Sequence, residues 1–221
     1  MKSPISRRAA LARAGLSLAS LGVLGACSAS LLPAPPAAPT LYALDDAAAG
    51  RKPAPGAPGA PGAPGARTII VSPPRAAAGY DTRGIVYLRQ AHAVEVYAYS
   101  QWVDTPAQML APLIVHALES TGAFRAVLLA PIVADAELRL DTELLRLQQD
   151  FTVSPSRVRL TLRAVLVETA TRRVVAWREF DATVAAPSED AYGGVRAANR
   201  AVQDLLAELA AFSVQAVGAA R

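Results

Sequence analysis

Residues 157–166 read Arg-Val-Arg-Leu-Thr-Leu-Arg-Ala-Val-Leu, and this stretch decides the fold. Apolar and polar side chains alternate along it, which is the pattern of a β-strand with one face buried and the other in water. Residues 138–144 and 174–184 alternate in the same way. Strands with one polar face are typical of antiparallel sheets that are covered on one side. The sequence therefore predicts an antiparallel sheet at the centre of the domain.

Three further strands are predicted earlier in the chain. Thr68–Val71 is β-branched and is followed by two prolines, and 85–88 is a second short apolar run. In 94–99, Val94, Val96 and Ala98 alternate with Glu95, Tyr97 and Tyr99, which predicts a half-buried strand. We expect the folded domain to span residues 67–215.

Two amphipathic helices are predicted from a spacing of three to four residues between apolar positions. The first begins after Thr105, with Pro106 in its first position and Gln108 placed to complete a capping box, and it ends at Gly122. The second covers about 189–214. Two helices packed on one face of a mostly antiparallel sheet give an α+β fold.

The first 26 residues have the composition of a lipoprotein signal peptide. Four basic residues precede an uncharged, mostly apolar segment from Gly15 to Gly25, which is too short for the roughly 20 residues of a membrane span. Leu24-Gly25-Ala26-Cys27 resembles the bacterial lipobox, in which the cysteine thiol receives a lipid and the chain is cut before it. Cys27 is the only cysteine, so we expect it to be the lipid anchor and expect no internal disulfide.

Two features near the signal peptide bear on export and sorting. Ser6-Arg7-Arg8 resembles the twin-arginine export motif, although adjacent arginines are also common in ordinary signal peptides. Ser28 follows the lipidated cysteine, and by the sorting rule of enterobacteria-like lipoproteins a serine there favours the periplasmic face of the outer membrane.

Residues 27–66 are predicted to be a lipid anchor and a linker rich in Ala, Pro and Gly. The triplet Ala-Pro-Gly occurs four times from Ala54 to Gly65, and such a composition buries too little surface to fold. Residues 41–44 are apolar enough for an edge strand. If they dock on the domain, the repeats form a surface loop. If they do not, the whole stretch is linker.

The charge of the chain argues against nucleic acid as a partner. The full sequence has 22 basic and 18 acidic side chains, but the signal peptide holds four of the basic ones and none of the acidic ones. Removing it leaves 18 of each, whereas a nucleic-acid-binding domain carries a basic surplus.

The sequence offers no arrangement typical of catalysis. The histidines are His92, before a strand, and His116, on the flank of an apolar helix face, and two histidines without a free cysteine do not make a zinc site. Gly193-Gly194 stands outside any phosphate-binding motif. We therefore expect no enzyme activity, no cofactor and no metal.

Three segments together resemble the ABC-type transport auxiliary lipoproteins, the family of the PqiC-like component of MCE lipid-transport systems. They are Tyr80–Tyr87, with its Asp-x-Arg sequence; Ser100–Asp104, with a tryptophan before the helix; and Ser120–Val127, with Ser-x-Gly-x-Phe. Their order after a lipobox and linker carries the resemblance, which covers about Leu41 to Phe212.

The resemblance implies a non-catalytic role beside an ABC permease, an ATPase and a periplasmic MCE-domain protein, which carry phospholipid or other apolar molecules between membranes. It also implies a homo-oligomer around a symmetric MCE partner. Trp102, Tyr97 and Tyr99 are candidates for the contact surface, since aromatic side chains are enriched at interface cores; ordinary packing is the alternative. Asp81 and Arg83 either take part in docking or shape a turn through a local ion pair.

Two other classes of function stay open from the sequence. One is a lipoprotein that itself binds a lipid or another small molecule between helix and sheet. The other is an envelope-assembly lipoprotein whose partner is an outer-membrane protein.

Overall fold

The structure, a computed structural model, describes residues 38–45, 66–132 and 135–219. The predicted signal peptide, Cys27 and the Ala-Pro-Gly repeats lie outside these ranges. Pro39–Arg221 form one compact unit. This unit therefore includes the segment around Leu41 as well as the predicted domain.

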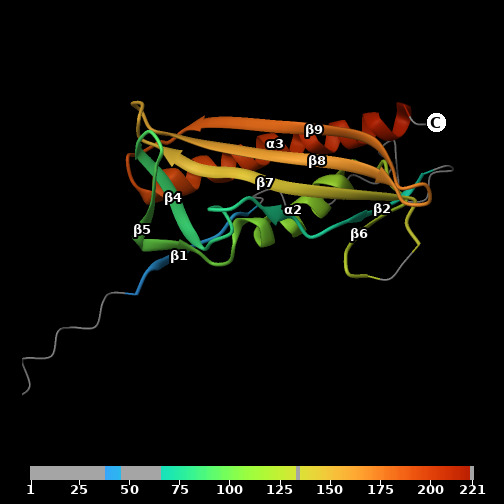
Figure 1. The fold of residues 1–221 in the computed structure, drawn as a ribbon, viewed down its shortest axis with the longest axis horizontal. Helices are drawn as coiled ribbons and strands as arrows, with labels where there is room; N and C mark the ends of the chain where they lie inside the picture. The colour runs from blue at the N-terminus through green and yellow to red at the C-terminus, as the bar shows by residue number, and fades with distance from the viewer. Residues whose placement is uncertain (1–37, 46–65, 133–134, 220–221) are drawn as a thin grey trace, which may run out of the picture. The chain divides into compact units, whose positions relative to one another are not determined.

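Three long consecutive strands lie side by side in the sheet, as Figure 1 shows: β7 (Leu138–Asp150), β8 (Arg157–Glu168) and β9 (Arg173–Ala185), with β9 at the edge. Both neighbouring pairs are antiparallel along nearly their whole length. These strands are the ones that the alternating sequence predicts, and β7 runs six residues beyond the predicted stretch. The predicted antiparallel pairing of these three strands is confirmed.

The sheet as a whole is mixed, so the prediction of a mostly antiparallel sheet is wrong. The other strands are β1 (Thr40–Tyr42), β2 (Thr68–Val71), β3 (Arg75–Ala76), β4 (Gly84–Gln90), β5 (Ala93–Trp102) and β6 (Ala126–Leu129). The free edge of β7 pairs in turn with β2, β3 and β4, all parallel to it. β6 pairs with β2 and β1 pairs with β5, again in parallel. Among the described pairings of these six strands, that of β5 with β4 alone is antiparallel. The sequence feature that indicates parallel pairing is the unbroken apolar run in β2 and in β4, which is typical of parallel strands.

Of the two alternatives for residues 41–44, the structure shows the one in which they dock on the domain. Residues Thr40–Tyr42 pair with Ser100–Trp102, and Leu44 just beyond them is buried. Residues 41–44 therefore belong to the folded unit, which begins well before residue 67.

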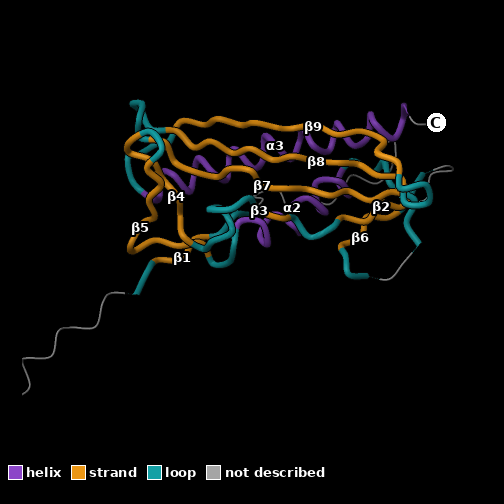
Figure 2. Tube along the Cα trace, in the orientation of Figure 1, coloured by secondary structure: helices purple, strands orange, loops and turns teal. Residues whose placement is uncertain are grey.

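Two helices cover one face of the sheet: α2 (Pro106–Ser120) and α3 (Ala191–Ala219) (Figures 1 and 2). Both are confirmed, and Gly122 has the left-handed φ of 63° expected at a helix end. The capping box is wrong: the Thr105 side chain makes no capping hydrogen bond, while its backbone N–H donates to Asp104 Oδ1 at 2.7 Å. No helix in the described ranges has the length and apolar character of a membrane span.

The core lies between the helices and the inner face of the central strands. Its largest fully buried side chains come from both layers, including Leu140, Leu144, Leu160, Leu162, Leu166 and Phe180 of the sheet and Leu110, Ile114, Leu118 and Leu209 of the helices. On the outer face, Arg163 bridges Glu143 and Glu179 at 3.4 and 3.2 Å. The outer face is thus the charge-paired, solvated surface that the alternation indicates.

One strand has its apolar side open. β5 forms as predicted, but Val94 and Val96 are 59% and 54% exposed, and Ala98 is exposed as well. Tyr97, on the polar side of the pattern, is the residue that packs against the core. The expectation of a half-buried strand is therefore met with the two sides exchanged.

Replacing Thr142 with Val should raise the free energy of unfolding by about 1 kcal/mol. Thr142 is only 4% exposed, and its hydroxyl has no hydrogen-bond partner among the described residues, so the folded state carries an uncompensated desolvation cost. Urea denaturation of the purified chain measures the change.

Thr161→Val is the matched control, since Thr161 is equally buried but donates its hydroxyl proton to Asp181 Oδ1 at 2.6 Å. It should lower stability by about 1 kcal/mol. Equal effects of the two variants would contradict the assignment of the unpartnered hydroxyl.

Candidate functional site

The candidate site is the junction between the β4–β5 hairpin, the last residues of β7 and the start of α3. Trp102, at the end of β5, is 3% exposed and belongs to the core. Its backbone N–H donates to the Arg83 carbonyl at 2.7 Å, and Arg83 Nε donates to the Trp102 carbonyl at 3.3 Å. The base of the hairpin is therefore fixed to the core from both strands.

A buried amide links the hairpin to α3. Gln149, 2% exposed, accepts a hydrogen bond from the Tyr97 hydroxyl and donates one to Ser156 Oγ, both at 3.0 Å. The Ser156 N–H donates in turn to Glu189 Oε1 at 2.8 Å, just before α3 begins. Buried polar groups hold their place only when they are hydrogen-bonded, so this chain of bonds fixes four segments relative to one another.

The start of α3 is capped by a carboxylate. Asp190 Oδ1 accepts hydrogen bonds from the Gly193 N–H at 2.7 Å and the Ser188 hydroxyl at 2.8 Å. The Gly193 N–H above all, and then the Ser188 hydroxyl, hold the pKa of Asp190 below its usual value. The positive end of the helix dipole is thus already occupied by the chain's own acid.

Tyrosines fasten the hairpin on its inner side. The rings of Tyr87 and Tyr97 lie 4.5 Å apart, and the Tyr87 hydroxyl donates to Glu95 Oε2 at 2.9 Å, which raises the pKa of Tyr87. Burial, followed by the nearby Tyr87 and Asp190, raises the pKa of Tyr97 to about 12. Both hydroxyls therefore stay protonated at neutral pH and act as hydrogen-bond donors.

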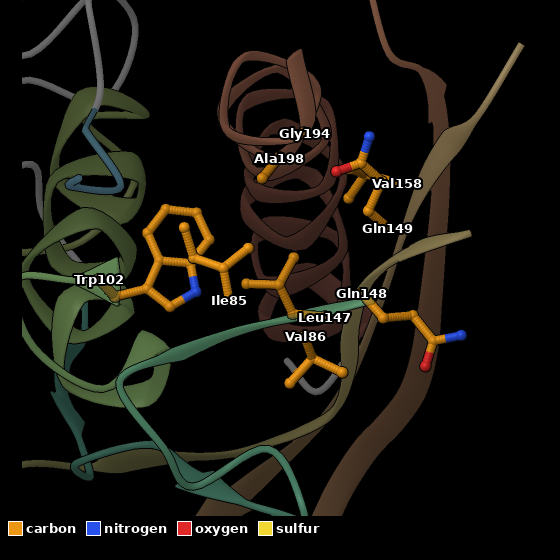
Figure 3. Close-up of a pocket in the computed structure, with 9 residues that line it drawn as sticks. All are labelled: Ile85, Val86, Trp102, Leu147, Gln148, Gln149, Val158, Gly194 and Ala198. Atoms are coloured by element: carbon orange, nitrogen blue, oxygen red, sulfur yellow. The ribbon is translucent and has the colours of Figure 1, made fainter. Parts of the chain in front are cut away.

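The pocket at this junction is very small. Figure 3 shows Trp102 and Ile85 facing Ala198 and Gly194 of α3 across it, with the nitrogen side of the indole turned toward Ile85 and Leu147. The cavity has a volume of about 10 Å³, which is the space of one water molecule. This pocket does not admit a lipid tail.

Two glycines make the close approach of α3 possible. A Cβ on Gly194 would lie 2.2 Å from Gln149 Oε1, and one on Gly193 would lie 2.1 Å from the Ser188 carbonyl oxygen. The pair Gly193-Gly194 therefore has a packing role at the junction.

A larger, open hollow of about 540 Å³ lies at the other end of β7, beside Arg125, Glu137 and Glu168. Its charged lining residues are Arg67, Arg125, Asp135, Glu137 and Glu168. Arg125 pairs with Glu137, and Glu168 pairs with Arg173. Because charges of both signs lie side by side, the hollow has no surplus of one sign large enough to select an ionic ligand.

The structure separates the predicted contact residues by depth. Tyr99 is 66% exposed, Tyr97 is half-buried and Trp102 lies beneath them. Asp81 and Arg83 are exposed, and among the described residues no ion pair joins them, so the turn is not shaped by that pair. The accessible part of the predicted surface is therefore Tyr99 with Asp81 and Arg83.

Neither histidine belongs to this junction. His92 has a φ of 68° in the exposed β4–β5 turn, and His116 lies on α2. Among the residues that the structure describes, no group of three or more His, Cys, Asp or Glu side chains could hold a metal ion.

Sequence reasoning missed Gln149 and Ser156. A signal for Gln149 existed, because Gln148-Gln149-Asp150 ends an apolar strand with three polar residues, all of them buried. Consecutive buried polar residues need partners. Two of the partners, Tyr80 for Gln148 and Tyr97 for Gln149, are 68 and 52 residues away, so the sequence alone does not identify them.

Comparisons with known proteins agree with this fold. The family model for the ABC-type transport auxiliary lipoprotein component matches residues 42–210. The crystal structure of protein XCC0632 from Xanthomonas campestris has a TM-score of 0.67 at 24% identity, over 80% of this chain and 96% of that one. An uncharacterized protein of known structure has a TM-score of 0.59 at 13% identity, over 79% and 97%. No curated protein matches. At these identities the two structures show the fold alone.

Replacing Gly194 with Ala should lower the free energy of unfolding by about 1–3 kcal/mol, the usual cost of overpacking. The new methyl group meets the Gln149 amide, which cannot move aside without breaking its bonds to Tyr97 and Ser156. Thermal or urea denaturation measures the loss. Gly218→Ala is the control in the same helix: a Cβ there meets nothing within 4 Å, so no loss is expected.

Replacing Tyr97 with Phe should reduce the loss of stability at alkaline pH. Tyrosine in the unfolded chain has a pKa of about 10, and Tyr97 in the folded chain has one of about 12. Between these values the unfolded state releases the proton first, so stability falls as pH rises. Urea denaturation at several pH values between 10 and 12 should give a shallower fall for the variant.

At neutral pH the same variant should lose about 1 kcal/mol, because Gln149 loses a hydrogen-bond donor. Tyr99→Phe is the control, since the exposed Tyr99 side chain should change stability at neutral pH by less than about 0.5 kcal/mol. An unchanged alkaline slope in Tyr97→Phe would contradict the assignment.

Proposed function

The chain belongs to the family of ABC-type transport auxiliary lipoprotein components, and from this premise we propose that it is a non-catalytic, lipid-anchored subunit of an MCE-type transporter. In this role it stands on the periplasmic face of a membrane, the outer membrane by its Ser28, and holds the periplasmic carrier protein there. The cargo is phospholipid or another apolar molecule. The observation that carries the proposal is the family match, which runs from β1 into α3 and so includes nearly all of the compact unit.

The position of β1 supports a role in holding a partner close to a membrane. Cys27 precedes Thr40 by 13 residues, and β1 is paired with β5 in the folded unit. At about 3.5 Å per residue the chain between them reaches at most about 45 Å. A lipid on Cys27 therefore keeps the β1–β5 edge within that distance of the membrane, and the Ala-Pro-Gly repeats are not part of the tether.

The exposed base of the hairpin is the surface that we assign to the carrier protein. Tyr99 offers a large amphipathic side chain, and Asp81 and Arg83 flank the same strand pair with charges open to solvent. Trp102 and Tyr97 support this surface from below through the core and Gln149. An aromatic residue at the centre and charges at the rim is the usual composition of a protein contact.

Photocrosslinking in intact cells tests the proposal. The tagged full-length chain, with p-benzoylphenylalanine in place of Tyr99, should capture an MCE-domain protein or its permease and ATPase, identified by mass spectrometry after detergent purification. Trp177 is the matched control position, since it is also an aromatic residue and is 65% exposed, but it lies on β9. It should capture much less of the carrier.

The same chain carrying Cys27→Ser should lose the carrier from the captured material, because the domain is no longer held at the membrane. An outer-membrane barrel protein as the main product would support the envelope-assembly alternative. A small molecule without protein would support the ligand-binding one. Either result would overturn the proposed transport role.

A further inference from the structure

The outer edge of β5 is open along most of its length. β4 pairs with one side of β5, and β1 pairs with the other side only at Ser100–Trp102. Among the described residues no strand pairs with 93–99 on that side, so the backbone groups that point there belong to no ladder. Val94, Val96 and Ala98 are exposed on the same segment. An open edge with apolar side chains is a ready site for another strand.

The sequence upstream of β1 is poorly suited to extend β1 along this edge. Continuing the register from Thr40 would place residues 33–39 beside 93–99, and four of these seven residues are prolines: Pro33, Pro35, Pro36 and Pro39. Proline has no N–H to donate to a ladder. A strand from another molecule is therefore better suited to this edge than the sequence upstream of β1.

The other long edge of the sheet is protected, which makes the contrast informative. β9 pairs only with β8, and Arg178 lies on its inner face, with its guanidinium 4.9 Å from the Phe180 ring and 3.3 Å from Glu208. Inward-pointing charges of this kind are a usual defence against edge-to-edge pairing. β5 has no Lys, Arg or Pro, and its one charged residue is Glu95.

The sequence of β5 is suited to pairing with itself. In an antiparallel pair related by a twofold axis perpendicular to the sheet, the axis passes through one residue position, which faces its own copy. An axis at Glu95 would set two carboxylates face to face, which is destabilising. An axis at Val96, the middle of 93–99, sets Glu95 opposite Tyr97 and Val94 opposite Ala98. Glu95 then keeps its own hydrogen bond from Tyr87.

We propose that β5 of one molecule pairs antiparallel with β5 of a second copy of this chain, with the two Val96 residues facing each other at the twofold axis. The sheet then continues from one molecule into the other, and Val94, Val96 and Ala98 of both copies form one apolar patch. In this register Tyr99 faces Ala93 of the second copy at the end of the paired segment, while Asp81 and Arg83 lie outside it. Membrane anchoring raises the local concentration of both copies and favours so short a pairing.

Cysteine crosslinking in membranes tests the pairing. Residues facing each other in antiparallel strands have Cα atoms about 4.5–5.5 Å apart, within the range of a disulfide. The full-length chain with Val96→Cys should form a disulfide-linked homodimer under mild oxidation, seen on a non-reducing gel. Val174→Cys on β9, where the native valine is 52% exposed, should not, and neither should the chain without added cysteine. Equal crosslinking of the Val96 and Val174 variants would overturn the proposal.

A charge exchange at the same position gives a second measurement. Val96→Glu and Val96→Lys should each remain monomeric in detergent, because like charges meet at the axis, while both should fold, since the side chain is exposed. Differently tagged copies of the two variants, produced together, should recover each other at least tenfold more than either recovers itself. Failure of the mixed pair, or capture of another protein by Val96→Cys, would overturn the self-pairing. The Val96 crosslink measures the homodimer whether or not Tyr99 captures the carrier.

Discussion

Backbone pairing along both edges of β7 is the constraint on which the rest of the structure depends. One edge takes β8 over its whole length, and the other takes β2, β3 and β4 in succession. Because those three strands are short, each is held in the sheet by β7 more than by one another. The alternation of Leu138, Leu140 and Leu144 then fixes which face of all these strands receives the helices. A one-residue slip of β7 would turn that apolar set toward water.

The same strand determines where the candidate site lies. β7 continues past its apolar stretch into Gln148, Gln149 and Asp150, which are buried and must be satisfied. Tyr80 donates to Gln148 at 2.5 Å, Tyr97 donates to Gln149, and Thr152 donates to Asp150 at 2.9 Å through its N–H. The polar end of β7 thus binds the hairpin and the start of α3 to one place. What results is a fixed support for an exposed surface, with room for no more than a water molecule inside.

The sequence predicted the elements whose pattern is local. Strong alternation predicted β7, β8 and β9, and Thr105, Pro106 and Gly122 marked the ends of α2. It failed where pairing is long-range: the direction of β2 relative to β7 depends on residues about 70 positions apart. β5 shows the limit of a period-two argument, because alternation tells which residues share a side but not which side meets the core. In β5, Tyr97 faces the core and its hydroxyl reaches Gln149, while Glu95 accepts a hydrogen bond from Tyr87 of β4.

The inward position of Tyr97 in β5 explains why Val94 and Val96 are exposed to solvent. Turning Val94 and Val96 inward would remove Tyr97 from Gln149 and Tyr87 from Glu95, so the buried amide would lose its donor. The polar junction therefore leaves Val94 and Val96 exposed beside an open strand edge, and such an edge favours a partner strand. No residue of β9 has to bond a buried amide in this way, and its inner face carries Arg178, which protects that edge. The exposed valines of β5 thus follow from the hydrogen bond that the buried Gln149, at the end of β7, accepts from Tyr97.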